Sequence, residues 1–86
     1  MHVEVAFSGS VKSVEALARF LRHLEVLVPQ PVDAPKVLMG DDGVIYVKAR
    51  FATEEEAWIA GEKMAEVGAD IVEETDVLVV LAPLSR

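Results

Sequence analysis

The sequence contains no cysteine and no asparagine, and Gln30 is its single glutamine. Without cysteine the chain has no disulfide, no thiolate metal ligand and no thiol nucleophile. Its 86 residues must therefore be stabilised by an apolar core, near the lower size at which a domain folds alone. Depletion of thermolabile side chains together with plentiful glutamate is typical of thermophilic proteins, so we expect a high melting temperature.

Long hydrophobic runs and an excess of basic charge are also missing. The longest apolar run, Val77 to Ala82, is far shorter than the roughly 20 residues that span a bilayer. No basic leader followed by an apolar stretch is present, so we expect a cytoplasmic protein. Fifteen acidic residues against eight basic ones give a net charge of −7, which opposes binding to polyanions.

The apolar residues recur with the periods of two helices and four strands. Thr53 and Glu56 form a capping box before the second helix, and Gly68 is a natural C-terminal cap for it. Asp42-Gly43 predicts a tight hairpin. The expected strands cover 2–8, 36–39, 44–51 and a last segment made of 71–72 and 77–82, and the expected helices cover 11–28 and 54–67.

This order, β-α-β-β-α-β, predicts a single domain over residues 1–86 with the ferredoxin-like plait. That α+β fold has a four-stranded antiparallel sheet with two helices on one face. Its first and third strands are central, and its second and fourth strands are edges. Pro29, Pro31 and Pro35 precede the second strand, which agrees with an edge position because proline lacks a backbone donor.

The segment Gly43 to Val47, which runs into a helix through Glu55-Glu56-Ala57, resembles the RNA-recognition motif. That family uses the same plait, and the resemblance implies a strand whose aromatic side chains stack on bases. Gly43, Tyr46 and Val47 fit the pattern. Val44 and Ala49 stand where the motif has further aromatic residues, and these departures weaken the match. RNA binding is therefore only a third alternative for this chain, after the two functions given below.

Two acidic clusters and one turn carry residue types that can bind ligands. Asp41 and Asp42 are adjacent, whereas a calcium loop alternates its ligands, so the hairpin interpretation is favoured. Glu54 to Glu56 fit helix capping, and no metal or cofactor is expected. Gly9, Ser10 and Lys12 form a candidate anion-binding turn before the first helix, with serine capping as the simpler interpretation.

The open face of the predicted sheet carries a second candidate site. Its members are His2, Glu4, Tyr46, Lys48 and Arg50. In the plait, Glu4 is expected opposite Lys48, with His2 near Arg50. These residues form either a ligand site or an ordinary charge-paired surface, because cross-strand pairs of opposite charge are common.

Surplus apolar residues give a candidate protein interface. Leu78 and Val80 would be exposed on the last strand, and Ile59 falls on the polar side of the second helix. We therefore expect a homodimer or a partner protein. The leading functional hypothesis is a non-catalytic interaction, regulatory or ligand-sensing module that acts through its open sheet face. The alternative is a small dimeric α+β-barrel-type enzyme with its site at the sheet or the subunit boundary; no catalytic residue is assigned.

Overall fold

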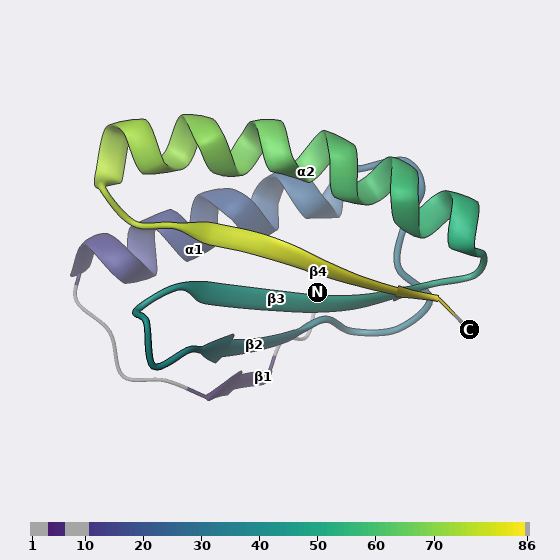
Figure 1. The fold of residues 1–86 in the computed structure, drawn as a ribbon, viewed down its shortest axis with the longest axis horizontal. Coiled ribbons are helices and arrows are strands. Elements are labelled where there is room, and N and C mark those ends of the chain that lie inside the picture. The colour runs from purple at the N-terminus through teal and green to yellow at the C-terminus, as the bar shows by residue number, and fades with distance from the viewer. Residues whose placement is uncertain (1–3, 7–10, 86) are drawn as a thin grey trace.

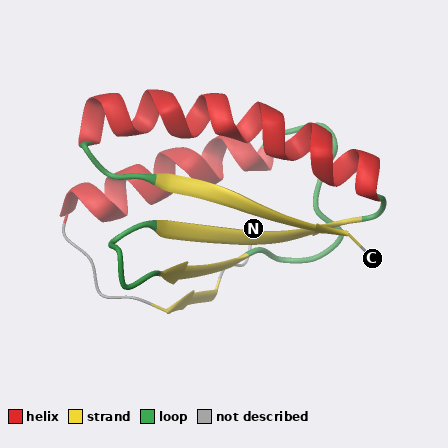
Figure 2. Cartoon of the chain, viewed as in Figure 1, coloured by secondary structure: helices red, strands yellow, loops and turns green. Residues whose placement is uncertain are grey.

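The computed structural model describes residues 4–6 and 11–85 (Figure 1). Two helices lie together on one face of a mixed sheet, as Figure 2 also shows. The elements in chain order are β1 (Glu4–Ala6), α1 (Val11–Glu25), β2 (Lys36–Met39), β3 (Ile45–Phe51), α2 (Glu54–Thr75) and β4 (Val79–Ser85).

The sheet is built around β3. Strand β2 pairs antiparallel with β3 through the hairpin, and β4 pairs parallel with β3 over its whole length, from Ile45↔Val79 to Phe51↔Ser85. These three strands form the body of the sheet. The three-residue β1 extends it beside β2, in parallel, with Glu4 opposite Lys36. The described strand order is therefore β1-β2-β3-β4.

The predicted ferredoxin-like plait is wrong. In the plait the first strand lies between the third and the fourth in an antiparallel sheet, whereas here β4 pairs directly with β3 and runs parallel to it. The seven residues of β3 carry backbone groups that need partners, and the seven residues of β4 pair with all of them, from Ile45 to Phe51. Strand β2 is internal rather than an edge.

Alternation along β3 was predicted correctly. Ile45, Val47, Ala49 and Phe51 are buried under the helices, and the residues between them face the other side. The hairpin before β3 also follows the prediction, because Gly43 adopts a φ of 82°. Glycine reaches this left-handed region without steric cost, so the chain reverses tightly there. The connector then runs along the far end of β3, where the Val32 N–H donates to the Arg50 carbonyl at 2.8 Å.

The apolar stripe that runs from α1 to Val28 is buried in its central part and exposed towards its ends. Phe20 and Leu24 are fully buried, but Val14 is 58% exposed and Val28, which follows the helix, is 75% exposed. The helix ends at Glu25 because the chain turns into the proline-rich connector. There the Gln30 side-chain amide donates to the carbonyls of Leu24 and Leu27, at 2.9 and 2.6 Å. The only glutamine of the chain thus caps the free carbonyl end of α1.

Helix α2 continues through Gly68 to Thr75, so the predicted stop at residue 67 and the strand segment at 71–72 are wrong. Gly68 serves close packing instead: a Cβ there would lie 2.6 Å from the Val79 carbonyl oxygen of β4. The helix ends where Asp76 takes a left-handed φ of 62° and its N–H donates to the Val72 carbonyl.

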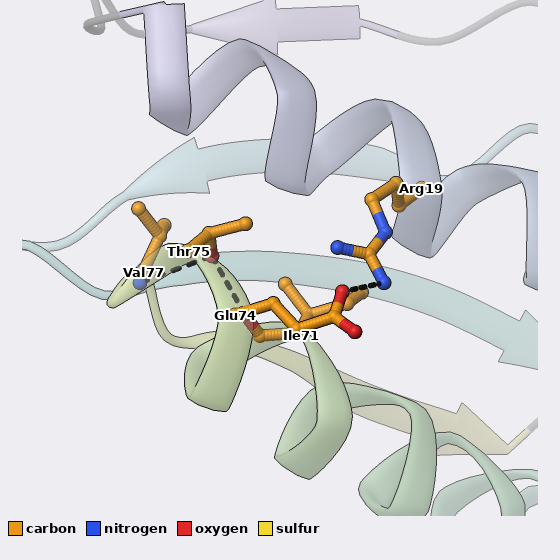
Figure 3. Close-up of polar contacts among 5 residues, drawn as sticks. All are labelled: Arg19, Ile71, Glu74, Thr75 and Val77. Atoms are coloured by element: carbon orange, nitrogen blue, oxygen red, sulfur yellow. Dashed lines mark hydrogen bonds and ion pairs between the residues drawn. The ribbon is translucent and has the colours of Figure 1, made fainter.

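Three polar contacts fasten the end of α2 (Figure 3). The buried Thr75 hydroxyl donates to the Ile71 carbonyl at 2.7 Å and accepts from the Val77 N–H at 3.2 Å. An ion pair of 2.5 Å joins Arg19 of α1 to Glu74 of α2. The segment Glu73 to Asp76, which the sequence left between strand and loop, is therefore the last turn of a helix and its cap.

Candidate functional site: the open face of the sheet

The helices cover one face of the sheet, and the other face is open. The register places Tyr46, Lys48 and Arg50 of β3 on this open face. The residues that share it by register with those three are Lys36 and Leu38 on β2 and Val80, Ala82 and Leu84 on β4. Three of the eight basic residues of an acidic chain therefore gather on one surface.

Lys36 and Lys48 are direct neighbours across the β2–β3 ladder. Directly opposed residues have Cβ atoms about 4.5–5.5 Å apart, and like charges in that position destabilise a sheet. Both side chains are exposed. Within residues 11–85, neither lysine makes an ion pair that would offset this repulsion. The pair therefore places two positive charges side by side on β2 and β3, with Glu4 of β1 as the neighbour of Lys36 on its other side.

Arg50 completes a basic rim around a shallow hollow. Its guanidinium is paired with the Asp33 carboxylate of the connector, and both side chains are about half exposed. The hollow has a volume of about 350 Å³, and its lining residues are Asp33, Ala34, Lys36, Lys48, Arg50 and Leu84. Leu84 is 50% exposed, so the hollow offers apolar surface beside its cations. Such a surface can hold an anionic group attached to a small apolar body.

Tyr46 does not line the hollow and instead contacts the hairpin before β3. Its hydroxyl donates to the Asp42 carboxylate at 3.0 Å, and the Val44 N–H donates to the other carboxylate oxygen at 3.0 Å. The hydrogen bond from Val44 and then that from Tyr46 lower the pKa of Asp42 below its ordinary value. The same contact with Asp42 raises the pKa of the Tyr46 phenol. Asp42 therefore holds the turn and the tyrosine ring together.

Replacement of Tyr46 by phenylalanine is expected to raise the pKa of Asp42 part of the way to its ordinary value. The bond from Val44 N–H remains, so the pKa stays below that value. A lowered carboxyl pKa stabilises the fold above the unfolded-state pKa, and this contribution is lost as the pH falls through the folded-state pKa. On acidification, Tyr46→Phe should therefore lose less of the unfolding free energy that Asp42 contributes than the unmodified protein loses. Carboxyl chemical shifts followed by NMR through the acid range measure the pKa, and an unchanged Asp42 pKa would contradict the assignment.

Of the remaining expected residues, the structure places only Glu4 and Lys12. Glu4 stands beside Lys36 in the register, not opposite Lys48, because β1 pairs with β2. His2 lies outside the described residues. Of the candidate anion-binding turn, Gly9 and Ser10 also lie outside them, and Lys12 is exposed in the first turn of α1.

The expected apolar interface is divided. Leu78 and Val80 line one apolar groove between α2 and β4, whereas Ile59 is half-buried on α2 and is not part of that lining.

Sequence reasoning missed Lys36 as a site residue. The hairpin contained the signal, because a ladder closed around residues 40–44 places residue 36 opposite residue 48. It also missed Trp58, which is 68% exposed on α2.

The described residues contain neither a side-chain cluster of the metal-binding kind nor a helix that could span a membrane. No group of three or more histidine, aspartate or glutamate side chains has the arrangement of a metal site in this part of the chain. None of the helices over these residues has the length and apolar character needed to cross a membrane. In comparisons with family models, curated proteins and solved structures, no match to the chain was found.

Proposed function

We propose that the protein is a non-catalytic binding module that holds the anionic group of a ligand on the open face of its sheet. The observation that carries the proposal is the direct opposition of Lys36 and Lys48, beside Arg50. In a chain with nearly twice as many acids as bases, two lysines directly opposite each other repel, and Glu4, the other cross-strand neighbour of Lys36, faces only one of them. An anion between them offsets this repulsion and gains charge-assisted hydrogen bonds.

The hollow limits the size and character of the ligand. Its volume of about 350 Å³ is at the lower end of the range of small-molecule sites. Arg50 is held by Asp33, so its guanidinium has a defined position at the rim. Leu84 and Ala34 supply the apolar part of the lining. We therefore expect a small organic anion, with a carboxylate or phosphate group on the lysines and an apolar body over Leu84.

Self-association through this same face is less favourable. A two-fold packing of one open face on another would bring Lys36, Lys48 and Arg50 of two copies together, and burying like charges is costly. RNA is also a poor fit, because Tyr46 is the only aromatic residue among the described positions of the open face. The residues of the site are cations that bind and orient, and the proposal includes no chemical step.

The variant Lys48→Glu separates a binding function from a structural one. It turns a repulsive cross-strand pair into an attractive one, so the free energy of unfolding of the free protein should rise by about 0.2–1 kcal/mol. The same change should weaken anion binding at least about tenfold, a loss of about 1.4 kcal/mol. Urea unfolding measures the first effect, and calorimetric titration with citrate and with pyrophosphate measures the second and distinguishes a carboxylate from a phosphate ligand.

Arg22→Glu is the matched control, because it makes the same charge change at an exposed position of α1. It should leave anion binding within about twofold of the unmodified protein, since its charge lies outside the hollow. Equal losses in the two variants would mean that net charge alone governs binding and would contradict the proposed site. So would an unmodified protein that binds neither anion, or one that binds only a single-stranded RNA.

A further inference from the structure

A carboxylate lies among the cations of the hollow on the open face of the sheet. Asp33 is the only one of the lining side chains that accepts hydrogen bonds, because lysine and arginine carry donors alone. Its Oδ2 atom pairs with Nη2 of Arg50. A carboxylate has about four acceptor positions, so Asp33 can accept a hydrogen bond from a ligand as well as from Arg50. The hollow therefore offers a ligand both signs of charge.

The backbone on both sides of Asp33 is held in place. Before it, the Val32 N–H donates to the Arg50 carbonyl at 2.8 Å. After it, Pro35 is fully buried, and β2 begins at Lys36. Moving Asp33 out of the hollow would break the attachment of the connector to β3, so a bound ligand has to accommodate its carboxylate.

A ligand that carries only negative charge meets Asp33 as a like charge. This repulsion is offset when a positively charged donor stands beside the anionic group of the ligand and donates to Asp33. Lys48 and Arg50 are alternate residues on one face of β3, so their Cα atoms are about 6.6–6.8 Å apart. A molecule that bridges the lysine pair and Asp33 is therefore small.

The acidic neighbours of the cations favour a ligand with a single negative group. By register Glu4 stands beside Lys36, and Asp33 pairs with Arg50. Within the described ladders, Lys48 has no acidic cross-strand neighbour. One carboxylate on the ligand meets this cation, whereas further negative groups would come closer to the two acids and be repelled.

Leu84 adds an apolar surface at a third point. It is the register partner of Arg50 on β4, and it is 50% exposed. Asp33 belongs to the connector, which bonds to Arg50 on the opposite side of β3, the side of β2. The lysine pair, the carboxylate and the apolar side chain thus lie at three different points around Arg50. An α-amino acid carries a carboxylate, an ammonium group and a side chain on one carbon atom, so it can present one group to each point.

We propose that the ligand of the hollow is a free α-amino acid with an apolar side chain. Its carboxylate binds Lys36 and Lys48, its ammonium group donates to Asp33, and its side chain packs on Leu84. This inference rests on the proposed function, because it uses the same hollow and the same lysine pair, and it adds a subsite for positive charge at Asp33.

Calorimetric titration of the full chain with three probes that share one apolar body tests the class of ligand. L-Leucine carries both charged groups, isocaproate lacks the ammonium group, and isopentylamine lacks the carboxylate. The unmodified protein should bind L-leucine at least about tenfold more tightly than either of the others, since each of these lacks a charge-assisted hydrogen bond. Isocaproate bound as tightly as L-leucine, or citrate or pyrophosphate bound while L-leucine is not, would overturn this inference and leave the proposed anion site standing. A protein that binds none of these anions and no L-leucine would overturn both.

The variant Asp33→Asn tests the subsite for positive charge. Asparagine keeps the shape of the side chain and removes its charge, so the preference for L-leucine over isocaproate should fall from at least about tenfold to about twofold or less. Isocaproate itself should bind this variant more tightly, because a like charge is gone. Asp70→Asn makes the same change at an exposed position of α2 and should keep the full preference. An unchanged preference in Asp33→Asn, with both probes weakened equally, would mean that Asp33 only positions Arg50 and would overturn the inference.

Discussion

The variant Phe20→Ala is expected to lose about 3–5 kcal/mol of unfolding free energy. Phe20 is fully buried in the core between α1, α2 and the sheet, and its ring lies close to Gly68. Alanine would leave a cavity that the surrounding helices fill only in part. A domain of 86 residues has a total stability of roughly 4–13 kcal/mol, so the variant should be close to unfolding without denaturant. Urea unfolding followed by circular dichroism measures the loss.

Val14→Ala is the control for this result. Val14 belongs to the same helix, but it is 58% exposed. Its replacement should change the unfolding free energy by less than about 0.5 kcal/mol, as for other surface positions. A large loss for Val14→Ala with a small one for Phe20→Ala would mean that α1 packs through the other stripe and would contradict the described core.

Gly68→Ala should destabilise the protein by about 1–3 kcal/mol, the usual cost of overpacking. Alanine is normally favoured over glycine in a helix by about 0.5–1 kcal/mol, so the expected sign is opposite to that of helix propensity. The reason is the Val79 carbonyl oxygen, which a Cβ at position 68 would approach to 2.6 Å. The Cβ position is fixed by the backbone of α2 and the oxygen belongs to the backbone of β4, so neither atom can turn away and the two elements must move apart. Thermal and urea unfolding both measure the change.

Gly61→Ala is the matched control on the same helix. Its added Cβ would meet the Pro83 ring at 3.4 Å, an ordinary contact distance. We therefore expect a neutral effect or a gain of up to about 1 kcal/mol from helix propensity. If Gly68→Ala were as stable as Gly61→Ala, the close crossing of α2 over β4 would be disproved.

Local features of the fold followed from the sequence. The Asp42-Gly43 hairpin, the alternation of β3 and the Thr53 cap depend on residues close together in the chain, and all three are present. Strand order could not be derived in this way. It depends on which strands pair with the backbone of β3, and these are brought together by contacts between residues far apart in the chain. The end of α2 was misplaced because glycine at position 68 has two uses, as a helix cap and as a site of close packing.

The candidate site was predicted only in part, because its composition also depends on which strands pair. Lys48 and Arg50 were identified because they alternate with the buried residues of one strand. Their neighbours depend on pairing, so Glu4 was assigned to the wrong partner and Lys36 was overlooked. Asp33 could not be found from local pattern, because its contact with Arg50 depends on the path of the connector beside β3.

The open face of the sheet and helix α2 carry charges of opposite sign. The positive groups Lys36, Lys48 and Arg50 occupy the open sheet face, whereas α2, across the sheet, carries acidic residues along its length. These acidic residues are Glu54, Glu55, Glu56, Glu62, Glu66, Asp70, Glu73 and Glu74. For the proposed anion site, this arrangement means that the acidic residues of α2 repel an approaching ligand, whereas the cations of the open sheet face attract it. Salt shortens the reach of this field to about 8 Å at physiological ionic strength.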